Sequence, residues 1–241
     1  MKTYTPKAEH IERRWWIVDA QVDFMDPQGR LYVKDLGDAT DPGATLIVDT
    51  LREAAAWMRE KCDLLVYTAD WHGPEDEEID LVSPDPLAGT YPPHCMGRSE
   101  DASERKGAAI IPEIRPTHPV VLAYDASPNA ASVVAAEAVA QRRPVLIQKT
   151  RFDVFTGNAA TESFLGALQD ALGGSLAFVV IGVARDVCVT QAVDGMQARG
   201  YAVTAISDAT WGLGLEPEVA TLARWAQKGR VATLAELREP S

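Results

Sequence analysis

One cysteine lies where a thiol could act as a nucleophile. Cys188 follows the apolar run 178–181 and falls in the first turn of a helix that is predicted to begin near Asp186. Unpaired N–H groups and the helix dipole at such a helix start favour a thiolate, and the same N–H groups can hold an oxyanion on a substrate carbonyl. A small buried thiol on a helix face is the alternative, because cysteine is among the most buried residue types. Position alone leaves both interpretations open.

Two charged residues close predicted buried strands. Asp19 ends the run 15–18, and Lys149 ends the run 144–148. A lysine that closes a buried strand loses hydration, so it needs a carboxylate partner or a lowered pKa. With Cys188 as nucleophile, Asp19 could serve as general base and Lys149 as electrostatic support. A plain salt bridge between the two strand ends is the alternative.

A third group has the residue types of a metal site. Asp70 and His72 form an Asp-x-His pair at a strand end, and the long loop that follows can return His94 to the same place. Carboxylate plus imidazole suits zinc, iron or manganese. The acidic run 75–78, which ends at Glu78, can supply another oxygen ligand. A solvated acidic surface loop with one histidine is the alternative.

The elements that must position these residues alternate between strands and helices. Strands are predicted over 15–18, 63–68, 119–123, 144–147, 176–182, 202–206 and 231–233, and helices over 44–59, 129–141, 161–172, 186–199 and 216–227. Continuously apolar strands separated by amphipathic helices indicate a mainly parallel sheet covered on both faces, so we expect a single α/β domain over 1–241. Ligands bind such sheets at the carboxyl ends of the strands, where all the candidate groups lie. The segment 73–116 has little periodicity and is predicted to be a functional loop or a poorly ordered excursion.

Composition excludes several classes of protein. With 23 Lys plus Arg against 35 Asp plus Glu, the net charge is −12 and the pI is near 4.8, which argues against a nucleic-acid partner. The chain lacks an apolar run of about 18 residues and its polar start lacks a signal-peptide core, so we expect no membrane span and a cytoplasmic location. The three cysteines, Cys62, Cys95 and Cys188, are too scattered for a disulfide framework and form no CxxC pair, and Cys62 is expected in the core.

Five short motifs follow one another along most of the chain. They are IVDAQVDF at 17–24, TADWH at 68–72, YPPHCMG at 91–97, KTRFDVF at 149–155 and GVARDVCV at 182–189. In this order they resemble the isochorismatase-like cysteine hydrolases, and most closely the nicotinamidases. The resemblance implies a three-layer α/β sandwich with a mainly parallel central sheet, a small-molecule amide substrate and a homo-oligomer.

The resemblance also implies roles for individual residues. It makes Asp19 the general base, Lys149 its charged partner and Cys188 the nucleophile. It implies a cis peptide between Val183 and Ala184, which turns the N–H groups of Ala184 and Cys188 toward an oxyanion. Asp70, His72 and His94 match metal ligands that hold the ring nitrogen of the substrate, and Phe24 and Tyr91 match aromatic walls of the pocket.

The chain departs from the nicotinamidase pattern at three places. Glu78 stands where another histidine often follows, Tyr91 takes the place of the usual tryptophan, and the segment 119–143 is longer than the family's core requires. We predict a cysteine amidohydrolase that releases ammonia from a small amide, with nicotinamide to nicotinate favoured. The expected cofactor is a divalent metal, zinc ahead of iron or manganese. The alternatives are a related cysteine hydrolase of another small amide or carbamoyl compound without a metal, and a non-catalytic member of the fold.

Overall fold

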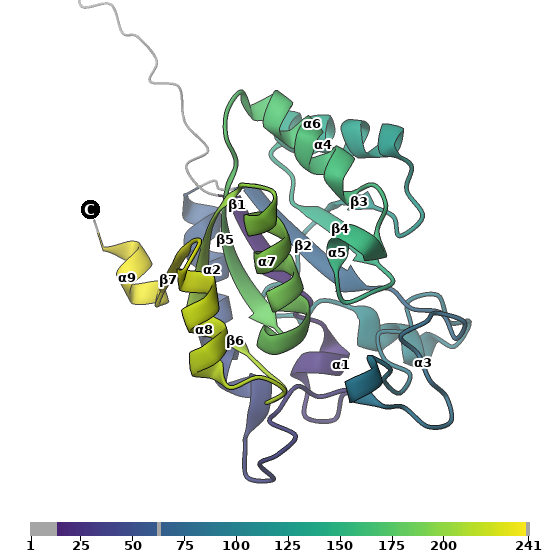
Figure 1. Ribbon diagram of the computed structural model, residues 1–241. Coiled ribbons are helices and arrows are strands. Elements are labelled where there is room, and N and C mark those ends of the chain that lie inside the picture. The colour runs from purple at the N-terminus through teal and green to yellow at the C-terminus, as the bar shows by residue number, and fades with distance from the viewer. Residues whose placement is uncertain (1–13, 62–63, 240–241) are drawn as a thin grey trace, which may run out of the picture.

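The computed structural model describes residues 14–61 and 64–239, and over these residues the chain builds three layers around a parallel sheet (Figure 1). The sheet has seven strands in the order β3-β4-β2-β1-β5-β6-β7, and every pairing is parallel. The strands are β1 (Arg14–Val18), β2 (Leu64–Asp70), β3 (Val120–Leu122), β4 (Val145–Lys149), β5 (Ala177–Val183), β6 (Ala202–Trp211) and β7 (Arg230–Ala232). The predicted α/β fold is confirmed.

Helices cover both faces of the sheet. The longer ones are α2 (Val48–Glu60), α4 (Pro128–Gln141), α6 (Thr161–Leu172), α7 (Thr190–Ala198) and α8 (Glu218–Ala226), and the short ones are α1 (Val22–Met25), α3 (Ala102–Arg105), α5 (Val154–Gly157) and α9 (Leu234–Arg238). Single turns of 3₁₀-helix form η1 (Gly43–Ile47), η2 (Pro86–Ala88) and η3 (Lys106–Ala108), and a π-helical turn forms η4 (Arg185–Val189). No helix of the described residues is long and apolar enough to span a bilayer.

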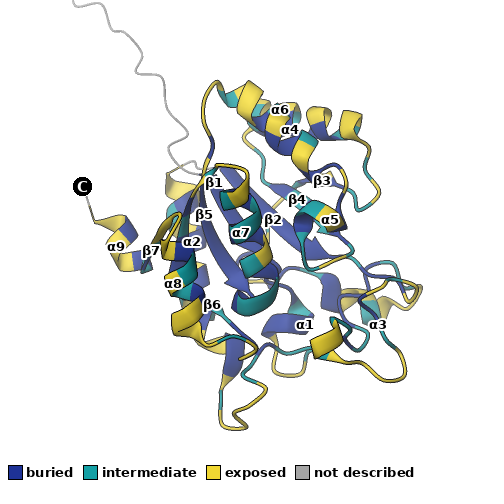
Figure 2. Ribbon diagram, viewed as in Figure 1, coloured by how far each residue is buried: buried dark blue, intermediate teal, exposed yellow. Residues whose placement is uncertain are grey.

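The strands are buried because side chains on both of their faces enter hydrophobic cores. In β1, Trp15 and Ile17 join the core under α2 and α9, whereas Trp16 and Val18 join the core under α4, α6, α7 and α8. Figure 2 shows this as dark blue strands between helices whose outer sides are yellow. Burial on both faces explains why the strands are continuously apolar in sequence.

Some elements differ from the prediction in detail. The predicted helix 186–199 starts as the π-helical turn η4, and the strand predicted over 202–206 continues as β6 to Trp211. It continues because a register shift between Val180 and Gly182 lets β6 pair again with the end of β5. The short helices α1, α3, α5 and α9 were not predicted, because four or five residues carry too little periodicity to show.

Two long segments are ordered parts of the fold. The segment 119–143 forms the edge strand β3 and helix α4, which packs on α6. The segment 73–116 holds η2, α3 and η3, and Gln21 Nε2 ties it to the sheet by donating to the carbonyl oxygens of Ala108 (2.9 Å) and Asp70 (2.8 Å). The segment therefore lies against the strand ends, and the prediction that it is a functional loop remains a prediction. Cys62 lies outside the described residues.

Candidate active site

Four chemically active side chains meet at the carboxyl ends of four neighbouring strands. Asp19 follows β1, Asp70 ends β2, Lys149 ends β4, and Cys188 lies in η4 just after β5. The four strands are adjacent in the order β4-β2-β1-β5, and Asp70 pairs in register with Lys149. Strand order thus brings together residues that are far apart in the chain.

Lys149 lies between two buried carboxylates. Its Nζ is 2.8 Å from Oδ2 of Asp19, donates a hydrogen bond to Oδ1 of Asp70, and lies 3.1 Å from the carbonyl oxygen of Arg151. The side chains of Lys149, Asp19 and Asp70 are at most 1% exposed. Thr68 Oγ1 donates to the other oxygen of Asp19 at 2.7 Å. The buried lysine therefore has the carboxylate partners that its position required.

The Cys188 sulfur lies within 4.8 Å of a carboxylate oxygen of Asp19 and of one of Asp70. Burial raises the pKa of the Cys188 thiol well above its usual value, and the Lys149 ammonium opposes this in part. Burial thus outweighs the stabilisation of a thiolate that was expected from the helix start, and the resting group is a neutral thiol. A nearby base must accept its proton before the sulfur can attack.

Asp19 is suited to accept that proton. Burial raises the pKa of the Asp19 carboxyl, Lys149 lowers it and Asp70 raises it, and the net shift is upward. The pKa of Lys149 itself stands well above its ordinary value, because Asp19 and Asp70 outweigh its burial. The lysine stays charged beside Asp19, whose raised pKa makes it a better proton acceptor than an exposed aspartate.

The chain turns sharply between β5 and Cys188. Gly182 has φ +124°, and a Cβ there would lie 2.0 Å from the carbonyl oxygen of Val18 on β1. The next peptide, Val183–Ala184, is cis, as the resemblance predicted. The carbonyl oxygen of Ala184 accepts the N–H groups of Val187 (3.1 Å) and Val189 (3.0 Å), which closes the turn that carries Cys188. Ala184 and Cys188 line the same pocket, and their use as oxyanion donors stays a prediction.

Asp70, His72 and His94 form the predicted metal group. Oδ2 of Asp70 is 3.8 Å from Nε2 of His72 and 3.9 Å from Nε2 of His94. Within the described residues, Asp70 Oδ2 and His72 Nε2 are buried without a hydrogen-bond partner. Two ligand atoms that each lie about 2.1 Å from one ion are at most about 4.2 Å apart. The spacing and the unpartnered atoms therefore fit a divalent metal ion.

The other ring nitrogen of each histidine is already engaged. His72 Nδ1 is 3.1 Å from Oδ2 of Asp76, and His94 Nδ1 is 2.7 Å from the carbonyl oxygen of Pro92. Partners of this kind orient histidine ligands in metal proteins. Burial and His72 lower the pKa of His94 to about 4, whereas Asp70 and Asp76 outweigh burial and raise the pKa of His72 to about 9. A metal ion would have to displace the His72 proton, since histidine binds metals as the neutral ring.

Glu78 lies near this group but is not one of the three residues whose ligand atoms are all within 4.8 Å of one another. Its Oε1 accepts the N–H of Phe152 at 2.8 Å, and its buried Oε2 has no hydrogen-bond partner among the described residues. Burial raises the pKa of Glu78 to about 8. The prediction that Glu78 ligates the metal remains a prediction.

A small pocket, partly open to solvent, reaches both groups through Cys188, Asp70 and His94, whereas Asp19, Lys149 and His72 are not in its lining. The predicted residues in its lining are Phe24, Asp70, Tyr91, His94, Ala184 and Cys188. Leu31, Val33, Phe152, Val187 and Leu213 also line it, and sequence reasoning assigned none of them to the site. Phe152 and Val187 lie inside motifs that were recognised, so their motifs could have suggested them. Leu31, Val33 and Leu213 lie outside the helices and strands and carry no such signal.

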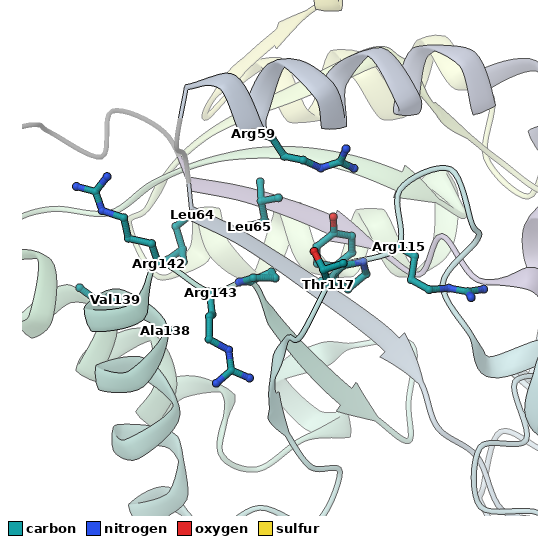
Figure 3. Close-up of a pocket in the computed structure, with 12 residues that line it drawn as sticks. Arg59, Leu64, Leu65, Arg115, Thr117, Ala138, Val139, Arg142 and Arg143 are labelled. Carbon is teal, nitrogen blue, oxygen red and sulfur yellow. The ribbon is translucent and has the colours of Figure 1, made fainter.

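A larger groove of about 880 Å³, open to solvent, lies at the amino ends of the strands, where β2 and β4 begin (Figure 3). Its described lining includes Arg59, Arg115, Arg142 and Arg143 but no cysteine, carboxylate or histidine. Figure 3 shows Arg115 and Arg142 pointing away from each other. Arg59 and Arg142 lie at the carboxyl ends of α2 and α4, where the helix dipole stabilises positive charge. The described lining of this groove therefore has no thiol, carboxylate or imidazole that could act as a nucleophile, a general base or a metal ligand.

Comparison with known proteins agrees with this fold. Residues 123–236 match the family model of the isochorismatase domain, and no curated protein matches the chain. The chain therefore has the isochorismatase-like fold, and the predicted resemblance to that superfamily is confirmed.

Three solved structures illustrate the likeness. N-carbamoylsarcosine amidase from Thermoplasma acidophilum is 21% identical with a TM-score of 0.60, covering 92% of this chain and 95% of its own. Nicotinamidase from Bacillus subtilis is 16% identical with a TM-score of 0.62, covering 91% and 98%. Pyrazinamidase of Pyrococcus horikoshii, solved in complex with zinc, is 22% identical with a TM-score of 0.60, covering 92% and 99%. At these identities the likeness shows the fold and leaves the substrate open.

Proposed function

We propose that this protein, which has the isochorismatase-like fold, is a cysteine amidohydrolase that releases ammonia from a small, uncharged aromatic amide, with nicotinamide as the favoured substrate. One observation carries the proposal. The Cys188 sulfur, which lines the pocket, lies within 4.8 Å of a carboxylate oxygen of Asp19, and Lys149 is ion-paired to that carboxylate.

In the first half of the reaction, Asp19 takes the thiol proton and the sulfur of Cys188 attacks the amide carbon. The carbonyl π bond opens, and backbone N–H groups at Ala184 and Cys188 hold the resulting oxyanion. When the carbonyl re-forms, the C–N bond breaks and the protonated Asp19 gives its proton to the leaving nitrogen. Ammonia departs and a thioester on Cys188 remains.

In the second half, Asp19 takes a proton from water, whose oxygen attacks the thioester carbon. The C–S bond then breaks, the sulfur regains the proton from Asp19, and the carboxylic acid leaves. Lys149 keeps its charge throughout and holds the Asp19 carboxylate in place by their 2.8 Å ion pair. One amide and one water thus give one acid and one ammonia.

Asp70, His72 and His94 are the residues that would hold a divalent metal, with zinc favoured. A bound ion supplies a Lewis acid that fixes a ring nitrogen of the substrate, a templating role rather than one of making hydroxide. Asp70 serves both groups, because its Oδ1 is bonded to Lys149 and its Oδ2 faces the two histidines. The zinc in the Pyrococcus pyrazinamidase supports this assignment.

The pocket lining favours an uncharged planar substrate. Phe24, Tyr91 and Phe152 bring aromatic rings, and Leu31, Val33 and Leu213 bring apolar side chains. Among the described residues of this lining there is no lysine or arginine to pair with an anionic substrate. Acidic carbamoyl compounds therefore fit less well, although the likeness to N-carbamoylsarcosine amidase keeps a carbamoyl substrate as the second candidate.

The test is ammonia release from nicotinamide and a panel of small amides and carbamoyl compounds, with and without a chelator. We expect turnover of nicotinamide that Cys188→Ala reduces by more than about 10⁴-fold. Cys95→Ala, which removes another buried free thiol, should retain turnover.

Two results would overturn parts of the proposal. Turnover that survives both chelation and full loss of metal would point to the metal-free alternative. A wild-type protein that releases no ammonia from any panel member, with Cys188 titrating as an ordinary thiol, would point to a non-catalytic member of the fold.

A further inference from the structure

Asp186, two residues before the nucleophile, binds a loop rather than its own helical turn. Its Oδ1 accepts the N–H of Leu213 at 2.8 Å, and its Oδ2 accepts the N–H groups of Leu215 at 2.7 Å and Glu216 at 3.4 Å. An acid in the first turn of a helix is ordinarily explained by the helix dipole. Here the carboxylate instead joins the turn that carries Cys188 to the loop after β6.

That loop supplies one wall of the pocket. Leu213 is 3% exposed and lines the pocket together with Leu31 and Val33. The carbonyl oxygen of Leu213 accepts the N–H of Leu36 at 2.8 Å, so the segment that carries Leu31 and Val33 is bonded to Leu213 in turn. The apolar wall is therefore linked to Cys188 through Asp186.

Besides Asp186, the described contacts of this loop are the hydrogen bond from Leu36 N–H to the Leu213 carbonyl and the bonds of the Glu216 carboxylate to Thr221 and Arg224. Leu213 stands between Gly212 and Gly214, and Gly214 has φ +76°, a conformation that glycine adopts readily. Glycines on both sides give the backbone of Leu213 freedom that ordinary residues would remove. Of the described contacts, the three hydrogen bonds to the Asp186 carboxylate are the ones that tie this backbone to the turn that carries Cys188.

We propose that Asp186 is a positioning residue that holds the apolar wall of the pocket at a fixed distance from Cys188 and thereby sets which substrates fit. The substrate in this proposal rests on the proposed function, whereas the hydrogen bonds between Asp186 and the wall do not. Asp186 would act on binding and on size selectivity, through Leu213, and would take no part in breaking the C–N bond.

The main test compares Asp186→Asn with Asp208→Asn. Asp208 is a matched control, because its Oδ1 likewise accepts one backbone N–H, that of Leu234 at 2.9 Å, away from the pocket. An amide at position 186 presents an NH₂ group to backbone donors, which releases the loop. For the best amide of the panel we expect KM to rise about tenfold with kcat within about twofold, since losing a fitted apolar contact costs about that much. Asp208→Asn should change neither.

A second readout does not depend on turnover. Cys188 is alkylated with iodoacetamide and with the bulkier N-phenyl iodoacetamide, and its labelling is followed by peptide mass spectrometry. In Asp186→Asn the ratio of bulky to small labelling rates should rise about tenfold, and Leu213→Ala should raise it directly. The double variant should add little to either, because both act on one wall.

The proposal is wrong if Asp186→Asn leaves this ratio unchanged, if kcat falls while KM does not move, or if its effect adds fully to that of Leu213→Ala. If Asp186→Asn does not fold, Asp186→Glu keeps the charge but displaces its oxygens, and it should move the ratio in the same direction. A wild-type protein without amidase activity would contradict the proposed function alone. The labelling ratio would still measure how closely the apolar wall approaches Cys188.

Discussion

Replacing Lys149 by methionine tests the electrostatics of the site most directly. The substitution keeps an unbranched apolar stem and removes the ammonium that lies between Asp19 and Asp70, two carboxylates that are at most 1% exposed. Removing one partner of a buried ion pair costs about 3–5 kcal/mol, because an uncompensated charge stays buried. We expect Lys149→Met to lower the free energy of unfolding at neutral pH by an amount in that range.

The loss should depend on pH in a defined direction. Without the ammonium, burial and repulsion from Asp70 raise the folded-state pKa of the Asp19 carboxyl further above its unfolded value of about 3.9, whereas His72 still compensates Asp70 in part. A carboxyl whose pKa is raised by folding destabilises the protein above that pKa, and the penalty disappears as the pH falls and the group is protonated. The difference between Lys149→Met and wild type should therefore be largest near pH 8 and shrink toward pH 5.

Equilibrium unfolding in urea at several pH values measures both effects. The protein is treated with a chelator first, so that no metal ion neutralises Asp70. Lys228→Met is the control, because Lys228 is exposed, and it should change the free energy of unfolding by less than about 0.5 kcal/mol. A loss below about 1 kcal/mol for Lys149→Met, or a loss that does not vary with pH, would refute the reasoning.

Three further predictions follow from the same geometry. Asp76→Asn should weaken zinc binding about 10–100-fold in a chelator competition, because Asp76 orients a histidine ligand, whereas Glu75→Gln on the exposed side of the same ion-pair network should not. The acidic limb of the kcat/KM profile should lie above the ordinary aspartate range, because Asp19, the proposed base, has a raised pKa and activity is lost once it is protonated. Gly182→Ala should destabilise the protein by about 1–3 kcal/mol in thermal unfolding, since its Cβ would meet a β1 carbonyl oxygen, whereas Gly166→Ala, with no atom within 4 Å of the new Cβ, should be neutral or stabilising.

The reactive groups were predictable because each stands out against its local sequence. A charged residue at the end of an apolar strand, such as Asp19 or Lys149, needs a partner, and a parallel sheet gathers strand ends along one edge. Asp70 was placed by the same argument, and Cys188 was placed by the helix start that follows a strand at that edge. Local sequence and a simple topological rule were therefore sufficient for these four positions.

The apolar wall of the pocket was not predictable in this way. Leu213 belongs to no periodic element, and its position depends on a hydrogen bond to Asp186, 27 residues earlier in the chain. The raised pKa of the Cys188 thiol could not be predicted from the sequence either. The sequence indicates a helix start but not the extent of burial that raises this pKa. Both depend on tertiary contacts that no local pattern encodes.

Strand order explains why Cys188 and Asp19 meet where they do. Along the sheet, β1 is followed by β2, β4 and β3 on one side and by β5, β6 and β7 on the other, so the direction of chain progression reverses between β1 and β5. Open parallel sheets bind ligands at such a reversal, outside the carboxyl ends of the strands. Asp19 leaves β1 and Cys188 follows β5 at that point, and Gly182 allows the two strands to approach closely. The topology thus places a crevice there for any sequence with this fold, and it is the thiol, the carboxylate and the ammonium that give this crevice its chemistry.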